Sequence, residues 1–147
     1  LKSGATVNGR EYRNHLDGYN FLPYMTGKAE RGPRKSFFYW SDDGLLTGIR
    51  TGDWKVVFAE QRERGFEVWR EPFDTLRIPK VFHLRRDPFE RADDHANTYD
   101  DWWVRIALPR LAIARVELAK FLETMKLFPP RQRPDTFTID QMMEDFD

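Results

Sequence analysis

The chain has 147 residues, which is a typical length for one domain. Its 24 basic and 24 acidic residues balance, so it lacks the overall field that would attract nucleic acid or an anionic membrane. It has no apolar run of about 20 residues, so no membrane span is expected. Because cysteine is absent, disulfides, thiolate metal sites and a cysteine nucleophile are excluded.

The first residues predict a small hairpin. Asn8-Gly9 favours the positive φ angles of a type I′ turn, so Ala5–Val7 is expected to pair with Arg10–Tyr12. Such a hairpin alone would be marginally stable.

The chain between the hairpin and residue 35 predicts a connection. Asp17-Gly18 marks a turn, and Leu22-Pro23 predicts one short helical turn or an extended segment closed by Gly27. Residues 28–35 are expected to form a charged surface loop.

A β region follows. Residues 36–41, 45–52 and 53–60 predict three strands, the last two joined through Thr51-Gly52-Asp53. These short connections exclude parallel crossovers between residues 36 and 60. In the third strand, one predicted face carries Trp54, Val56 and Phe58, and the other carries Lys55, Val57 and Ala59. Both faces are partly apolar, which predicts a central strand with a helix on one side.

The chain after residue 60 is harder to assign. Residues 66–69 are interpreted as a further short strand, and 71–80, which contain two prolines, as irregular. A last strand is expected within 81–88, where Asp87-Pro88 stops it.

The remainder is predicted to be helical, in two stretches. Apolar residues recur at helical spacing, with Pro109 suited to a first turn and Pro129-Pro130 to a stop. The apolar positions are Leu111, Ala114, Leu118, Phe121 or Leu122, and Met125. Thr138 and Asp140 indicate another short helical start. The predicted class is α+β, with a mostly antiparallel sheet against a long C-terminal helix.

Residues able to carry chemistry do not form a complete site in the sequence. His15, His83 and His95 lack the spacing of a zinc site, so structural or surface roles are expected. Asp42-Asp43-Gly44 could hold a hard cation, but a β-turn is favoured because no oxygen-rich loop surrounds it. The pairs Asp93-Asp94 and Asp100-Asp101 are interpreted as complements to helix dipoles.

Other site patterns are also incomplete. Ser3, Ser36 and Ser41 lie outside any Gly-x-Ser-x-Gly elbow, and the basic segment 27–35 lacks Walker spacing. An aromatic and basic sheet platform for nucleic acid is disfavoured by the neutral charge; core packing with outward Arg50 and Lys55 is preferred. We therefore expect no catalytic and no metal-binding residues in this chain.

Three segments together carry a resemblance. They are "HLDGYNFLPYMTGKAERGPRKSFFYWSDDG" (15–44), "GIRTGDWKVVF" (48–58) and "FHLRRDPFERAD" (82–93). In this order and spacing they resemble the C-terminal part of arylsulfatases of the type-I, formylglycine-dependent family. The closing residues 121–146 also resemble the end of a bacterial arylsulfatase.

The resemblance implies a fold and a division of the chain. It implies about four antiparallel strands against a helix, the C-terminal subdomain of the alkaline-phosphatase-like superfamily. Residues 36–147 would form this subdomain, and residues 1–35 a connecting segment packed on a catalytic domain. In this interpretation Trp54 lies in the core, Lys55 points the other way, and Phe21, Leu22 and Tyr24 are exposed unless the catalytic domain or self-association covers them.

The resemblance also implies what this chain lacks. The family's formylglycine arises in a Cys/Ser-x-Pro-x-Arg motif and its calcium is held by Asp and Asn; neither motif is present here, so both groups are expected only in the catalytic domain. The start at Leu1, without a secretory signal, fits a processed or truncated chain. We expect a sulfuric ester hydrolase fragment that is inactive alone, or alternatively a stand-alone protein-interaction module. A homo-oligomer is possible in either case, and the compartment is left open.

Overall fold

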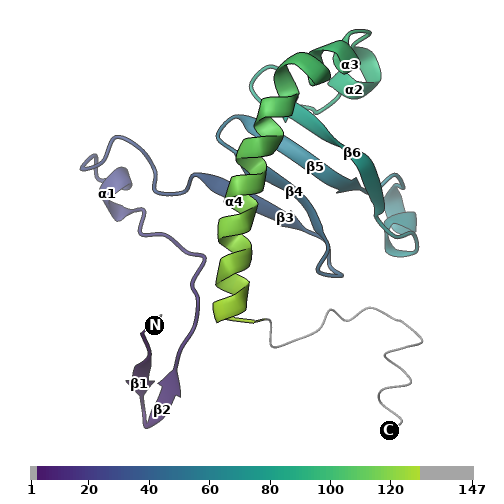
Figure 1. Cartoon of the computed structure of the whole chain (residues 1–147). Helices are drawn as coiled ribbons and strands as arrows, with labels where there is room; N and C mark the ends of the chain where they lie inside the picture. The colour runs from purple at the N-terminus through teal and green to yellow at the C-terminus, as the bar shows by residue number, and fades with distance from the viewer. Residues whose placement is uncertain (1–2, 130–147) are drawn as a thin grey trace, which may run out of the picture.

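A computed structural model describes residues 3–129 (Figure 1). Its centre is a four-stranded antiparallel sheet in the order β3-β4-β5-β6, and the helix α4 crosses one face of it. The strands are β3 (Ser36–Trp40), β4 (Leu46–Thr51), β5 (Trp54–Glu60) and β6 (Asp74–His83), and α4 is Leu108–Leu127. The predicted α+β class, with about four antiparallel strands and a C-terminal helix, is confirmed.

The β4–β5 hairpin has the predicted turn. Thr51 pairs with Trp54, which leaves Gly52 and Asp53 as the two turn residues, and Gly52 has a φ of 60°. The turn between β3 and β4 is also confirmed: the Gly44 N–H donates to the Ser41 carbonyl at 3.1 Å.

The core lies between the sheet and α4. Ile49, Val56 and Val81 from the three adjacent strands β4, β5 and β6 meet Ala107 and Ala114 from the helical region, and all five are buried. Trp54 and Phe58 pack against this cluster, so the face of β5 predicted to carry Trp54, Val56 and Phe58 is the face toward the helix.

The strand β6 is longer than predicted. It begins at Asp74 rather than near residue 81 and runs through Pro79. Proline is tolerated because β6 is an edge strand and because it contains a bulge. Val57 pairs with Lys80 and Ala59 with Thr75, so residues 75–80 of β6 lie opposite only residues 57–59 of β5. Pro79 lies in this bulge.

The strand predicted at residues 66–69 is wrong. Residues Gly65–Trp69 form a 3-10 helix, η1, in which Phe66 and Trp69 are largely exposed. Within residues 3–129 this segment pairs with no strand of the sheet, whose order is β3-β4-β5-β6.

The helical region contains more elements than the two stretches predicted. They are α2 (Ala92–His95), α3 (Tyr99–Trp102), a π-helical turn η2 (Trp103–Ala107) and α4. Pro109 lies in the first turn of α4 as predicted. Of the two alternatives, Phe121 faces the sheet and stacks on Phe38 with ring centroids 4.3 Å apart, whereas Leu122 is exposed.

Side chains from α3 and η2 protect the free edge of β6. The Tyr99 hydroxyl accepts from the Val81 N–H at 2.9 Å and donates to the Val81 carbonyl at 3.0 Å. The Trp103 Nε1–H donates to the Pro79 carbonyl at 2.9 Å. These bonds satisfy backbone groups that would otherwise be open to another strand.

The N-terminal segment projects away from the sheet (Figure 1). The predicted hairpin is confirmed as β1 (Ala5–Val7) and β2 (Arg10–Tyr12), and both turn residues, Asn8 and Gly9, have positive φ. The predicted helical turn is α1 (Leu22–Met25). No helix among residues 3–129 is long and apolar enough to cross a membrane. The helical start predicted at Thr138 and Asp140 lies outside the described residues.

Candidate interaction surface

The sheet has a second face, opposite α4, which we call the open face. Strand alternation places on it Phe37 and Tyr39 from β3, Gly48 and Arg50 from β4, Lys55, Val57 and Ala59 from β5, and Lys80 and Phe82 from β6. Part of this face is shielded by the segment after β6. A hollow of about 340 Å³ lies there, lined among others by Lys55, Lys80, Glu90 and Asp93.

One ion pair joins the open face to the segment after β6. The Lys55 Nζ donates to both carboxylate oxygens of Glu90, at 2.8 and 2.7 Å, and lies 4.7 Å from the centre of the Tyr39 ring. Glu90 has a φ of 54°, which is unusual for a residue other than glycine. The ion pair joins Glu90 to β5, so the segment after β6 makes a direct contact with the open face.

A second ionic cluster centres on Lys80. Its Nζ lies 2.7 Å from a Glu60 carboxylate oxygen and also binds Asp93. Burial by itself would lower the pKa of Lys80, but hydrogen bonds to Asp93 and Glu60 outweigh burial and raise it. Burial also raises the pKa of the nearby Tyr99 hydroxyl, although its hydrogen bond to Val81 works in the opposite direction.

The first helix after β6 is capped differently from the prediction. Asp93 lies in the first turn of α2, but its side chain binds Lys80. The first N–H groups are instead bound by Asp87: its two carboxylate oxygens accept from the Arg91 and Ala92 N–H groups at 3.1 and 2.8 Å. Asp94, Asp100 and Asp101 lie in first turns, where they complement the helix dipoles.

The three histidines lie apart, each against other protein groups. His15 Nδ1 is 3.2 Å from Asp17, the ring of His83 lies edge-on to Trp54 at 4.7 Å, and His95 Nδ1 is 3.3 Å from the Arg91 carbonyl. Within residues 3–129, no three His, Asp or Glu side chains are grouped as metal ligands.

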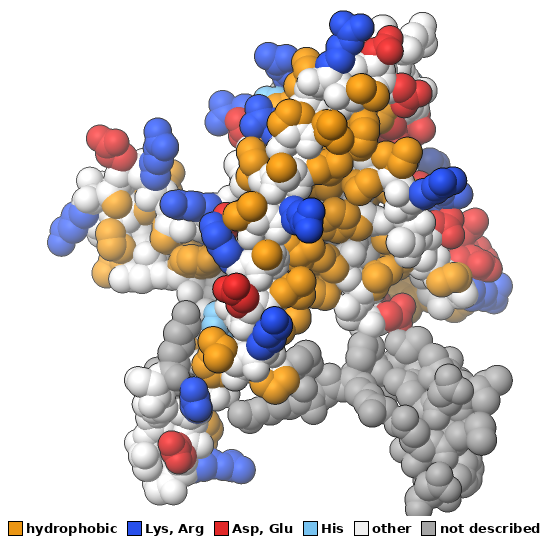
Figure 2. Space-filling model, viewed as in Figure 1, with side chains coloured by type: hydrophobic (Ala, Val, Ile, Leu, Met, Phe, Trp, Pro, Cys, Tyr) orange, Lys and Arg blue, Asp and Glu red, His pale blue; other side chains and the backbone are white. Residues whose placement is uncertain are grey.

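Large apolar side chains are also exposed around α1 and along α4, besides those of η1. Phe21, Leu22 and Tyr24 around α1 are exposed, as expected, together with Met25. The outer side of α4 also carries exposed apolar residues, and Figure 2 shows hydrophobic side chains along this helix and the sheet beside it. On α4 they include Ile113, Val116, Leu122 and Leu127. Exposed apolar groups of this kind indicate a surface made for contact.

No protein-family model matches this chain, and no curated protein matches its sequence.

Sequence reasoning did not find the Lys80 cluster. The alternation of Lys55, Val57 and Ala59 indicated the open face, but Lys80 was assigned to an irregular segment because of Pro79. The signal that could have found this strand is the alternation of its side chains between two faces. Ile78, Lys80 and Phe82 lie on one face and Pro79, Val81 and His83 on the other, where Val81 is fully buried.

Proposed function

We propose that this chain is the C-terminal subdomain of an arylsulfatase-like enzyme of the type-I, formylglycine-dependent family. It serves a structural role in a sulfuric ester hydrolase and borders the substrate pocket without catalysing the reaction itself. The support is the order and spacing of the three segments that resemble the family, together with an α+β fold of the expected kind.

The observation that carries the proposal is the meeting of two separate motifs. Trp54-Lys55 and Asp87-Pro88-x-Glu90 lie more than 30 residues apart, yet Lys55 binds Glu90 through both carboxylate oxygens. Asp87 binds the next two N–H groups of the chain, and Trp54 packs on the core. Trp54, Lys55, Asp87 and Glu90 therefore each have a physical role in building one lobe, which supports a shared structural purpose for the two motifs.

The reaction groups of the family would come from the catalytic domain. The chain contains no cysteine and no Ser-x-Pro-x-Arg, and its described residues do not fit a calcium site. Residues 1–35 would pack on that domain and cover the exposed apolar side chains around α1.

The upstream reading frame tests the proposal directly. A Cys- or Ser-x-Pro-x-Arg segment is expected in frame before Leu1, and the 147-residue chain alone should not hydrolyse an aryl sulfate. A start codon immediately before Leu1, or sulfatase activity of the chain alone, would refute the proposal.

Light scattering tests the docking of the α1 region. If exposed apolar groups cause self-association in the absence of a catalytic domain, Leu22→Glu with Met25→Glu should shift the chain toward monomer. Ile78→Glu with Phe89→Glu is the matched control, because these side chains are equally exposed elsewhere. Equal effects of the two pairs would contradict a specific docking surface.

A second candidate is a stand-alone interaction module descended from such a subdomain. The exposed apolar side of α4 favours it, because a helix that is apolar on both sides is suited to a second contact. The same reading-frame test separates the two candidates, since only the first requires an upstream catalytic domain.

A further inference from the structure

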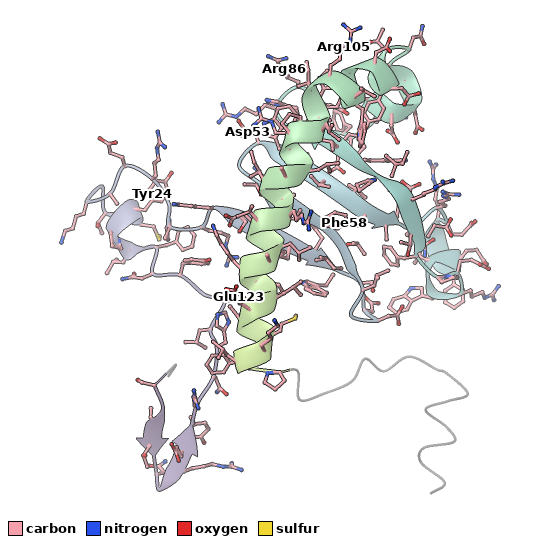
Figure 3. The ribbon with its side chains drawn as sticks, in the orientation of Figure 1. Tyr24, Asp53, Phe58, Arg86, Arg105 and Glu123 are labelled. Atoms are coloured by element: carbon pink, nitrogen blue, oxygen red, sulfur yellow. The ribbon has the colours of Figure 1, made fainter. Side chains whose placement is uncertain are left out.

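A second hollow, of about 760 Å³, lies at one end of the open face, between the start of β3 and the β4–β5 turn. Figure 3 labels Tyr24, on the α1 side, and Asp53, on the β4–β5 turn, which both line it. Its basic residues are Arg34, Lys35, Arg50 and Arg85, its rings are Tyr24, Phe37 and Tyr39, and its single carboxylate is Asp53. We call it the basic hollow.

Two of its guanidinium groups are held in place through Nε. The Arg50 Nε–H donates to the Gly52 carbonyl at 2.9 Å, and the Arg85 Nε–H donates to Asp53 Oδ1 at 3.1 Å. The terminal Nη groups of both arginines have no protein partner among residues 3–129. These are the donors that bind an oxyanion through two parallel hydrogen bonds.

The remaining basic groups add charge from the other wall. The Lys35 side chain also has no protein partner within the described part of the chain, while its carbonyl accepts from the Gly52 N–H at 3.3 Å. That bond joins Lys35 to the β4–β5 turn, which directly follows the end of β4 where Arg50 lies. Arg34 is partly engaged, because it donates to the Asp17 carbonyl at 3.0 Å and lies over Tyr19.

The charge of the basic hollow is strongly unbalanced. Four cations face one carboxylate, in a chain whose formal net charge is zero. The neighbouring hollow has the opposite excess, since its two lysines are outnumbered by Glu60, Glu90, Asp93 and Asp94. The excess of positive charge in one concave place, together with the Nη and Nζ donors that the described residues leave open, favours an anion there.

We propose that the basic hollow binds a small oxyanion such as phosphate or sulfate, between Arg50, Arg85 and Lys35. Phe37 and Tyr39, which contact each other edge-on at 4.9 Å, form a wall against which a ring attached to that anion would pack. This inference does not depend on the proposed function.

The test is a titration of the 147-residue chain with sodium phosphate, followed by the amide NMR signals of Lys35, Gly52 and Asp53, at constant ionic strength set with chloride. Saturable shifts at these amides are expected. In the double variant Arg50→Gln/Arg85→Gln the apparent Kd should rise about tenfold or more, because charge-assisted hydrogen bonds are lost.

The matched control is Arg64→Gln/Arg77→Gln, which removes the same charge from exposed positions away from the basic hollow. It should bind phosphate like the parent chain, and retained amide dispersion will show that both variants are folded. No saturable shift, or an equal loss in both double variants, would overturn the proposal.

A second titration with phenyl phosphate identifies the form of the anion. Tighter binding than inorganic phosphate, lost in Phe37→Leu, assigns an anion that carries an aromatic ring. Equal binding of the two assigns the free inorganic ion. Failure of both to bind overturns the site.

Discussion

The sheet with its helix and the N-terminal 35 residues differ in the interactions that stabilise them. In the first, Ile49, Val56 and Val81 are removed from water by the helical region; within residues 3–35, no side chain is buried. The N-terminal segment touches the rest through a few groups, such as His15 and Arg13 against the Phe128 ring. Local turn chemistry can shape a segment, but burial is needed to make it cooperative.

The largest expected effect comes from truncating the core. Ile49→Ala should lower the free energy of unfolding by about 2–5 kcal/mol, because a fully buried side chain leaves a cavity. Leu22→Ala, at an exposed position in the N-terminal segment, should change it by less than about 0.5 kcal/mol. Urea unfolding monitored by tryptophan fluorescence measures both. Similar costs at the two positions would break the comparison.

A backbone contact gives the next largest effect. A Cβ on Gly48 would lie 2.8 Å from the Val56 carbonyl oxygen, so Gly48→Ala must move one strand of the sheet. We expect a loss of about 1–3 kcal/mol. Gly18→Ala, where a Cβ meets nothing within 4 Å, is the matched change in the N-terminal segment and should be nearly neutral. Thermal unfolding of the two variants measures the difference between their stabilities.

Breaking the ion pair between Lys55 and Glu90 should lower the free energy of unfolding by about 1–3 kcal/mol. The loss should lie toward the lower end of this range because Glu90 is partly solvated. Lys55→Met tests this, with Lys28→Met as the control at an exposed site in the loop before β3. Glu90→Gln in the Lys55→Met background should recover part of the loss, because the uncompensated carboxylate is removed. No coupling in this double-mutant cycle would show that the pair does not hold the segment.

Alkaline pH should weaken the sheet and helix through two groups. The pKa values of Lys80 and Tyr99 are both raised, so the folded protein keeps protons that the unfolded chain releases. Their contribution is complete at neutral pH and declines as pH rises above about 10, through the folded pKa values. Urea midpoints between pH 7 and 11 should fall less steeply in Lys80→Met. An unchanged slope in that variant would exclude Lys80 as a source.

The smallest effect is expected from removing the hairpin. In the described part of the chain its two strands pair only with each other, so deleting residues 1–12 should change the unfolding free energy of the sheet by less than about 0.5 kcal/mol. Chemical denaturation of the shortened chain measures this. A large loss would mean that the hairpin supports the core and that the two regions fold together.

Local rules predicted the parts of the fold that depend on near neighbours. Asn8-Gly9, Gly52 and Pro109 each act within one turn, where backbone sterics determine the conformation, and all three assignments hold. The alternation along β5 also located its two faces correctly. The first half of β6 was predicted to be irregular because it contains Pro79. The bulge and the edge position that accommodate this proline depend on a partner strand 20 residues away.

Residue patterns alone predict the α+β class, the antiparallel order of the first three strands of the sheet, and the side of β5 that packs on the helix. Each follows from periodicity and short connections. Only the tertiary structure joined Lys55 to Glu90, Lys80 to Glu60 and Asp93, and four basic residues around one hollow. These groups come from separate strands and loops, and their distances depend on the register of β6 against β5 and on the paths of the loops, which no local pattern in this chain specifies.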